Sequence, residues 1–239
     1  MLAGEEQSPA IMWTRGPVLH EKKYDRFREI ATALQQVIGV SAPIEEFWVS
    51  SGSFNGLSPH DIPGRQWAIV TLSEHDKPEI AAHEIAHQIL EGVVAGMPRQ
   101  GVILEGLCDL AALEALGVIK GSNPAEIIRQ RADRYSRIQI SPEQEALLDE
   151  SADLTTVDFP PTNESLGHFI GRRFAYVAMA GSPDIPLAHL LHCVIAKPPS
   201  KEQLLDPQSY IDIVRSHPWT NKSIEPIETK FRDPPERLI

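Results

Sequence analysis

Apolar residues recur at intervals of three and four along much of the chain, the pattern of helices that bury one face. The first such stretch runs from Leu19 to Val37 and stops at Gly39. Similar periodicity, bounded by capping residues, glycine or proline, predicts further helices. These lie at residues 76–94, 101–116, 123–137, 141–150, 163–180, 184–196 and 208–216. The second half of the chain is therefore expected to be mostly helical.

Two short runs break this pattern in the first third of the chain. Ile44–Val49 and Trp67–Leu72 are rich in large apolar and β-branched residues, so we expect both to be strands. The helix after the second strand begins with Asp76 followed by Glu79 at the third position, which predicts a capping box. Pro78 fits the first turn of this helix, where its missing N–H is not needed. The next helix is expected to end at Gly117.

These elements predict an α+β fold. We expect an N-terminal lobe with a small sheet at residues 1–97, a helical C-terminal lobe at residues 98–217 and a Pro-rich tail at residues 218–239. A chain of 239 residues is long enough to bury a substantial core, in one large domain or in two lobes that share a cleft.

Composition and charge restrict the classes of partner that this chain is expected to bind. Apolar residues make up 42% of the chain and charged residues 23%, both typical of a globular protein. The formal net charge of −11 disfavours nucleic acid and anionic membranes as partners, because like charges repel. The first residues of the sequence do not show the basic and then apolar stretches of a secretory signal peptide. No apolar run is long enough to cross a bilayer, so we expect a cytoplasmic protein. Cys108 and Cys193 are too few for a disulfide framework, and we expect two buried thiols.

The central motif lies on the helix that starts after the second strand. His83 and His87 enclose Glu84 in an HExxH sequence, and residues four apart on a helix lie one turn above each other. Both imidazoles can therefore reach one zinc ion. Glu84, about 100° around the helix from His83, is placed to act as general base on a metal-bound water. The alternative is a chance match on an amphipathic helix.

A catalytic zinc site needs a third protein ligand, and the spacing restricts where it can be. A metzincin would have glycine and histidine at positions occupied by Leu90 and Val93, so that class is excluded. Glu105 lies on the next predicted helix and is followed one turn later by Asp109. A solvated helix face would be the alternative for these acids. Their neighbours are apolar, however, and carboxylates in such a run need a partner.

HExxH followed by ExxxD on a second helix resembles the gluzincin group of zinc metallopeptidases. The resemblance covers residues from about Trp67 to Val194 and implies a zincin-like fold. It implies a zinc site of His83, His87 and Glu105, with Glu84 as base and Asp109 orienting His83. It also implies a peptide or protein substrate, which would pair with the strand at residues 67–72.

The helix at residues 163–180 resembles a later gluzincin helix on which a side chain three residues before a glycine faces the metal. That position is His168, before Gly171, where the family more often has tyrosine. The resemblance implies that His168 stabilises the oxyanion of the tetrahedral intermediate; Tyr176, Arg172 and Arg173 are alternatives for this role. An ordinary helical histidine in the interface of the lobes would be the other interpretation.

Two other functions fit the same motif. One is a zinc hydrolase that acts on a non-peptide substrate, since the same water chemistry serves other acyl groups. The other is a non-catalytic binding or regulatory module stabilised by zinc, although a structural zinc would have no use for Glu84. His189 and His192 lie three residues apart but have no acidic or cysteine partner nearby in sequence, so we do not expect a second metal site.

Overall fold

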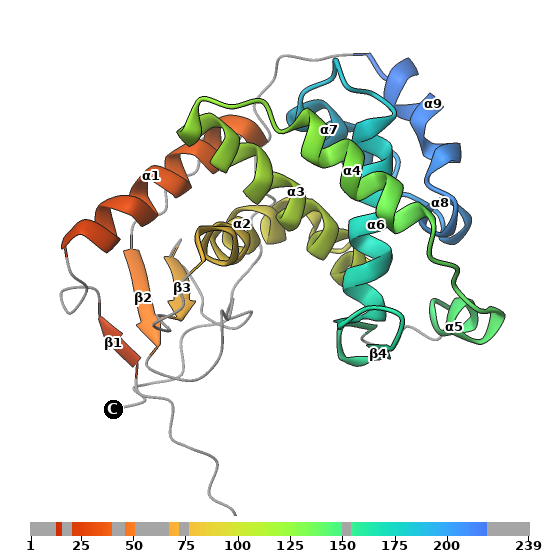
Figure 1. The fold of residues 1–239 in the computed structure, drawn as a ribbon, viewed down its shortest axis with the longest axis horizontal. Coiled ribbons are helices and arrows are strands. Elements are labelled where there is room, and N and C mark those ends of the chain that lie inside the picture. The colour runs from red at the N-terminus through yellow and green to blue at the C-terminus, as the bar shows by residue number, and fades with distance from the viewer. Residues whose placement is uncertain are drawn as a thin grey trace, which may run out of the picture.

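The computed structural model of the chain describes residues 13–15, 21–39, 46–50, 67–71, 77–149 and 154–218. These ranges are mostly helical and carry two small sheets, which confirms the α+β class (Figure 1). The helices are α1 (Glu21–Ile38), α2 (Pro78–Val94), α3 (Gln100–Lys120), α4 (Ala125–Ser136), α5 (Pro142–Leu147), α6 (Leu166–Ala180), α7 (Leu187–Ala196), α8 (Lys201–Leu205) and α9 (Gln208–Ser216), with a 3-10 turn η2 at Leu154–Thr156. The strands are β1 (Trp13–Arg15), β2 (Glu46–Ser50), β3 (Trp67–Thr71), β4 (Asp158–Phe159) and β5 (Glu164–Ser165).

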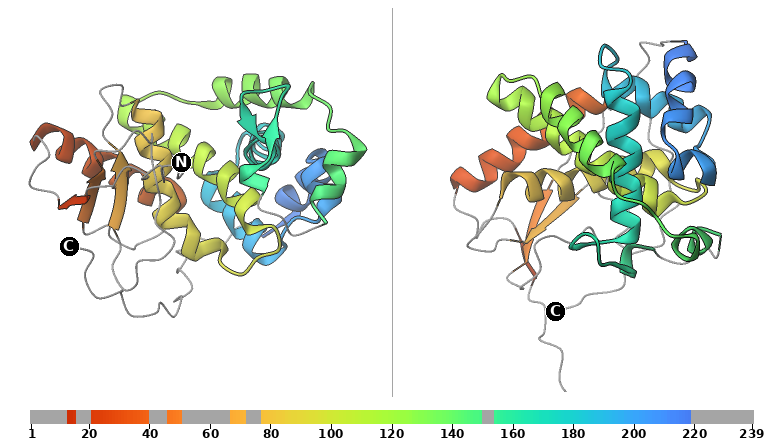
Figure 2. Two further views of the ribbon diagram at one scale, coloured as in Figure 1. Left: turned by 90° about the horizontal axis from the view of Figure 1, so that it is seen from below. Right: turned by 45° about the vertical axis from the view of Figure 1, so that its right-hand side comes forward.

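The larger sheet lies at the end of the molecule that also holds α1 and the start of α2 (Figures 1 and 2). Its strand order is β1-β2-β3, with β1 antiparallel to β2 and β2 parallel to β3. The parallel register places Glu46 opposite Trp67 and Ser50 opposite Thr71. Within the described ranges, β3 is therefore an edge strand, and α2 follows it in sequence.

Helix ends differ from the expected positions in two informative cases. The N-cap of α2 is Lys77, which makes no side-chain cap hydrogen bond, so the expected Asp76 capping box is wrong; Asp76 itself lies outside the described residues. Helix α3 continues through Gly117 and ends at Lys120, and its C-cap Gly121 adopts the left-handed conformation with φ 62°. Gly117 instead allows the chain after the helix to pack closely against it, because a Cβ there would lie 2.9 Å from the carbonyl oxygen of Ser122.

Helix α6 begins later than the expected position 163. Ser165 is its N-cap, and the serine hydroxyl accepts a hydrogen bond from the N–H of His168. Asn163 lies in the turn of the β4–β5 hairpin instead. Helix α7 similarly starts at Leu187, three residues after the expected start. Helix α8 has only five residues and was not predicted, because so short a segment shows no periodicity.

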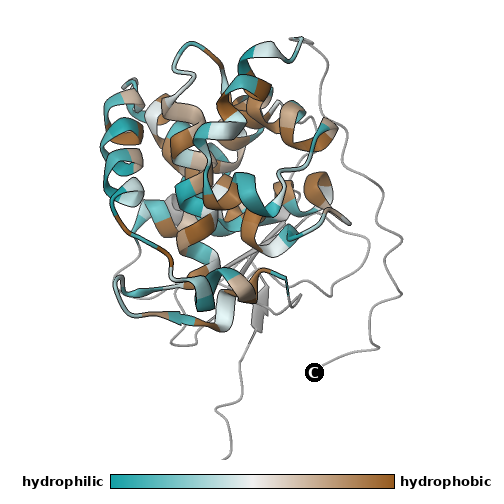
Figure 3. Ribbon diagram, turned by 90° about the vertical axis from the view of Figure 1, so that its right-hand side faces the viewer, coloured by the Kyte–Doolittle hydropathy of each residue, from teal (hydrophilic) through white to brown (hydrophobic). Residues whose placement is uncertain are grey.

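One continuous cluster of buried apolar side chains extends from Phe27 in α1 to Val214 in α9. Hydrophilic and hydrophobic residues alternate along the helices, as expected of helices that bury one face (Figure 3). The cluster crosses the expected boundary between residues 97 and 98, so both sides share a core; the division into lobes stays a prediction. In the described part of the chain, no helix combines the length and apolar character that a membrane span requires.

Two glycines bring the backbones of α3 and α6 very close together in this core. A Cβ on Gly106 would lie 1.9 Å from the carbonyl oxygen of Gly171, and a Cβ on Gly171 would lie 2.0 Å from that of Val102. Only glycine permits two helix backbones to approach so closely. The contact lies one residue after Glu105 on α3 and three residues after His168 on α6, so it sets the distance between these two side chains.

Replacing Gly171 with alanine should destabilise the fold, because the added methyl group meets rigid backbone. We expect the free energy of unfolding to fall by about 3 kcal/mol, the upper end for an overpacked site. Chemical denaturation would measure the change. Gly101→Ala on α3 is the matched control, because a Cβ there meets nothing within 4 Å. Equal stabilities of the two variants would contradict the proposed role of this contact.

Candidate metal centre

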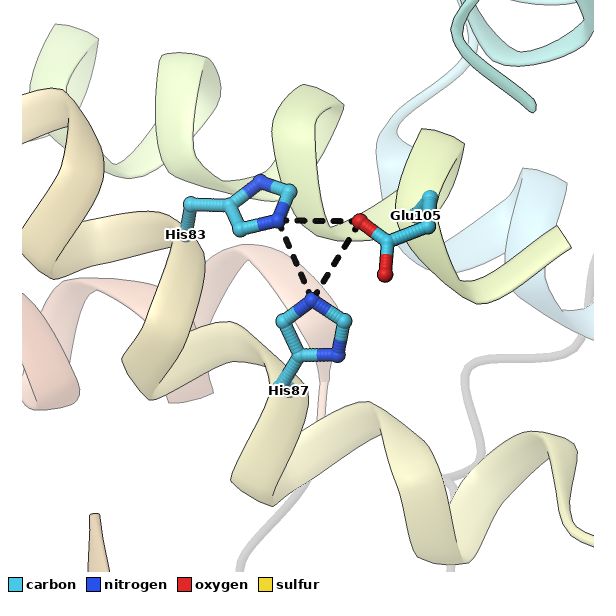
Figure 4. Close-up of side chains that lie close together, drawn as sticks. All are labelled: His83, His87 and Glu105. Carbon is cyan, nitrogen blue, oxygen red and sulfur yellow. Dashed lines mark hydrogen bonds and ion pairs between the residues drawn. The ribbon is translucent and has the colours of Figure 1, made fainter. Parts of the chain in front are cut away.

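Three side chains from two neighbouring helices converge where α2 packs on α3. His83 and His87 lie one turn apart on α2, and their Nε2 atoms are 3.0 Å apart. Oε2 of Glu105, on α3, lies 3.2 Å from Nε2 of His83 and 3.5 Å from Nε2 of His87. Figure 4 shows the two rings and the carboxylate pointing toward one another. The structure therefore brings together the three residues that the motif indicated.

The group is almost enclosed by the core. His83 is 9% exposed and His87 is 6% exposed. Ala82, Ile85 and Ala86 on the same helix are fully buried, so this part of α2 is held inside the core and cannot turn its imidazoles to solvent. Buried polar rings need partners to offset lost hydration.

The spacing of the three atoms suits a metal ion. Ligand atoms at about 2.0 to 2.2 Å from a tetrahedral ion lie about 3.3 to 3.6 Å from one another. The observed separations of 3.0, 3.2 and 3.5 Å are close to that range. Among the residues that the structure describes, no fourth His, Cys, Asp or Glu joins the group. The three residues could therefore hold a metal ion that keeps a position for another ligand.

Asp109 lies one turn after Glu105 on α3 and faces the far side of His83. Its Oδ1 is 3.6 Å from Nδ1 of His83, an ion-pair contact that is too long for a hydrogen bond. Nδ1 of His83 accordingly has no hydrogen-bond partner in the described part of the chain. The Asp109 carboxylate therefore lies on the side of His83 that the resemblance implies, and a shift of a few tenths of an ångström would bring Oδ1 within hydrogen-bond distance of Nδ1.

Three donors hold the Asp109 carboxylate from its other sides. The hydroxyl of Tyr176 donates to Oδ2 at 2.5 Å, and Nη1 of Arg131 donates to the same oxygen at 3.1 Å. Nη2 of Arg172 lies 3.4 Å from Oδ1. Arg131 also contacts the hydroxyl of Tyr176, which joins these two partners to each other. So many charged and hydroxyl donors keep the buried carboxylate ionised.

The charges in the site set its protonation. Burial alone would lower the pKa of His83, but the carboxylates of Asp109 and Glu105 outweigh it and raise the pKa to about 9. Burial opposes the charge of Glu105, yet hydrogen bonds from His168, His83 and His87 hold its pKa well below the usual range. The pKa of Asp109 is also lowered, against burial, by His83, Arg172 and Tyr176. At neutral pH and without a metal, both ring nitrogens of His83 are therefore protonated and the imidazole carries a positive charge.

Arg172 extends the network away from the metal ligands. Its Nη1 donates to Oε2 of Glu164 at 2.8 Å, and the hydroxyl of Tyr135 donates to Oε1 of Glu164 at 3.1 Å. The ring of Tyr135 stacks on that of Tyr176 at a centroid distance of 5.8 Å. Burial is the main reason that the pKa of Tyr135 rises to about 12, so this hydroxyl keeps its proton. Sequence reasoning missed Glu164, Tyr135 and Arg131.

His168 contacts the candidate metal-binding group through Glu105. Its Nε2 is 2.9 Å from Oε2 of Glu105, while its Nδ1 is 2.6 Å from the hydroxyl oxygen of Ser165. The ionised carboxylate of Glu105 can only accept a hydrogen bond, so Nε2 is the donor in this contact and Nδ1 of a neutral ring is left to accept from the Ser165 hydroxyl. The single proton of the neutral ring therefore lies on Nε2 and points at Glu105. His168 is thus at the site, although its donor is engaged by a ligand.

The other candidates lie apart or have other partners. Within the described ranges, Arg173 makes no hydrogen bond to the site, and its guanidinium group interacts electrostatically with the carboxylate of Asp206 instead. His189 contacts the carbonyl oxygen of Val214 at 2.8 Å. Cys108 and Cys193 are free and buried, as expected, and burial raises the pKa of both thiols. Glu84 is half-buried on α2 beside His83.

Metal affinity should rise with pH, because a metal ion must displace the proton that His83 holds. Since the pKa of His83 is raised to about 9, the proton is bound throughout the neutral range. We expect the association constant to increase about tenfold per pH unit between pH 6.5 and 8.5. Competition with a chromogenic chelator would measure it, after correction for protonation of the chelator. An affinity that does not change over this range would contradict the assignment.

Loss of the Tyr176 hydroxyl should weaken metal binding without unfolding the chain. Tyr176→Phe removes the shortest hydrogen bond to Asp109, so the carboxylate no longer stays in place behind His83. We expect affinity to fall about tenfold, the lower end for changes to groups that orient a ligand. Tyr210→Phe is the matched control, because that hydroxyl donates to the carbonyl oxygen of Lys197 instead. Equal affinities in the two variants would show that Tyr176 does not position the site.

The comparisons with known proteins do not assign the chain to a family. No protein-family model, no curated protein and no solved structure matches it. The function is therefore argued from the chemistry of the convergent residues.

Proposed function

We propose that this chain is a zinc-dependent metallopeptidase of the gluzincin type, with a zincin-like fold. The observation that carries the proposal is the convergence of His83, His87 and Glu105 through Nε2, Nε2 and Oε2 at separations of 3.0 to 3.5 Å. Two imidazoles and one carboxylate are a ligand set that catalytic zinc uses in hydrolases.

The number of ligands favours a catalytic over a structural ion. Structural zinc sites are closed by four protein ligands, whereas catalytic sites keep one position for water or substrate. In the described part of the chain, the group has three members, and both buried thiols remain outside it. A half-buried carboxylate, Glu84, adjoins His83 on the same helix. This combination supports hydrolysis.

Zinc bound at this site would supply Lewis-acid polarisation of a carbonyl group and lower the pKa of water. The chain's own residues then supply the proton transfers. Glu84 takes the proton from the attacking water and can pass it to the leaving amine. Asp109 keeps the imidazole of His83 oriented, and the arginines that hold Asp109 balance its charge.

His168 is the residue we propose for the developing oxyanion. Its Nε2 proton points at Glu105, and Ser165 fixes the ring through Nδ1. Rotation of the ring about this anchor would turn the donor from Glu105 to a substrate oxygen. A donor of this kind contributes about 2.7 to 4 kcal/mol to transition-state binding.

The edge position of β3 supports a peptide as substrate. An extended peptide can add to an open sheet edge through main-chain hydrogen bonds, which are independent of the peptide's sequence. Within the described ranges, β3 pairs on one side only, with β2, and the chain leads from β3 into α2. A substrate on this edge would lie close to the start of the helix that carries His83.

Glu84→Gln tests the proposal directly. The variant should keep zinc, because Glu84 is no ligand, and should lose hydrolysis of a peptide library by about 10² to 10⁴ fold through loss of the general base. Zinc content and turnover would be measured on the same sample. Glu79→Gln in the first turn of α2 is the matched control, an exposed carboxylate on the same helix.

The outcomes separate the alternative functions. Unchanged turnover in Glu84→Gln would refute the mechanism. A wild-type chain that cleaves small esters or amides but no peptide would be a hydrolase of another substrate class. A folded, zinc-loaded chain without activity on either panel would be a binding or regulatory module.

A further inference from the structure

A surface pocket of about 700 Å³ adjoins the metal centre on the side of α6. Its lining comes from η2, from the β4–β5 hairpin and from the first two turns of α6, and it includes His168 and Arg172. The hairpin lies at the end of α6, as Figures 1 and 2 show. The pocket therefore shares Glu164, Ser165, His168 and Arg172 with the network around the proposed metal ligands.

The hairpin that walls this pocket is anchored in the core. Phe159 of β4 is 1% exposed, and its ring lies 4.5 Å from that of Phe169 on α6. Neighbouring residues of a strand face opposite sides, so Asp158 points outward and is exposed. The antiparallel register places Asp158 opposite Ser165. Ser165 in turn holds Nδ1 of His168, so Asp158 stands close to the proposed catalytic residues.

Most charges around the pocket are balanced within the protein. Arg172 is shared by two carboxylates, Glu164 at 2.8 Å and Asp109 at 3.4 Å, so it offers no free positive charge. His168 faces Glu105. Asp158 lines the pocket, and within the described ranges it has no ion pair. The uncompensated charge on the pocket wall is therefore negative.

We propose that this pocket is a substrate subsite selective for a cationic amine, recognised by Asp158. The inference rests on the proposed peptidase function and names its substrate class, a peptide with an ammonium or guanidinium group next to the scissile bond. The amine could be a lysine or arginine side chain or the α-amino group of the substrate. An open, polar pocket with one unpaired carboxylate favours such a group over an apolar side chain.

The experiment uses matched fluorogenic peptides with lysine or glutamine at each position around the cleaved bond, each with a free or an acetylated amino terminus. The zinc-loaded full chain should prefer the cationic partner about tenfold in kcat/KM. Asp158→Asn should remove this preference and leave turnover of the neutral peptides within about twofold. Asp212→Asn, an exposed carboxylate on α9, is the control for the change in charge.

The peptide arms identify the source of the cation. If acetylation of the amino terminus alone removes the Asp158-dependent preference, the pocket binds the α-amino group. If replacement of lysine by glutamine removes the preference, the pocket binds the side chain. Efficient cleavage of all peptides with no effect of Asp158→Asn would overturn the subsite and leave the peptidase intact.

A binding measurement separates the two proposals. In the Glu84→Gln background, calorimetry should show tighter binding of the lysine peptide than of the glutamine peptide, and Asp158→Asn should remove the difference. If wild-type protein cleaves no peptide but this difference is present, the peptidase function fails and the cationic pocket stands. If neither cleavage nor the difference is seen, both proposals fail.

Discussion

The backbone contact between Gly106 and Gly171 is the constraint on which the site depends. A Cβ at either residue would come within about 2 Å of the opposite backbone, so the helices could not cross this closely with any residue other than glycine at these positions. Glu105 precedes one glycine and His168 precedes the other by three positions. The crossing therefore fixes their 2.9 Å contact, and α2, packed on α3, adds the two imidazoles.

Burying the carboxylates of Glu105 and Asp109 in an apolar crossing is costly unless each is paired. The chain provides imidazoles for Glu105 and two arginines with a tyrosine for Asp109. These partners come from α2, α4 and α6, so the charge network also ties separate helices to α3. A metal ion would replace the proton on His83 and place positive charge between the same carboxylates and imidazoles.

The sequence predicted what short-range chemistry determines. The spacing of four residues on one helix brings His83 and His87 together, and the apolar neighbours of Glu105 indicated that its carboxylate needs a partner. Gly117 was misread, because a glycine that permits close packing looks like one that ends a helix. Arg131 and Glu164 could not be found, since their positions depend on how α4 and the β4–β5 hairpin pack on α6, and neither residue carries a local signal. Arg172 was noted, but its role as a bridge between two carboxylates follows only from tertiary contacts.

Ser165 shows how the fold connects structural and chemical roles in one side chain. As the N-cap of α6, its hydroxyl oxygen accepts the backbone N–H of His168, and the same hydroxyl lies 2.6 Å from Nδ1 of that residue's imidazole. The strand pairing that fixes Ser165 also fixes Asp158 opposite it. The start of one helix thus holds the imidazole of His168 through Nδ1 and also sets the position of the Asp158 carboxylate. An imidazole beside the candidate metal centre and a carboxylate on the pocket wall are therefore coupled through a single two-residue ladder.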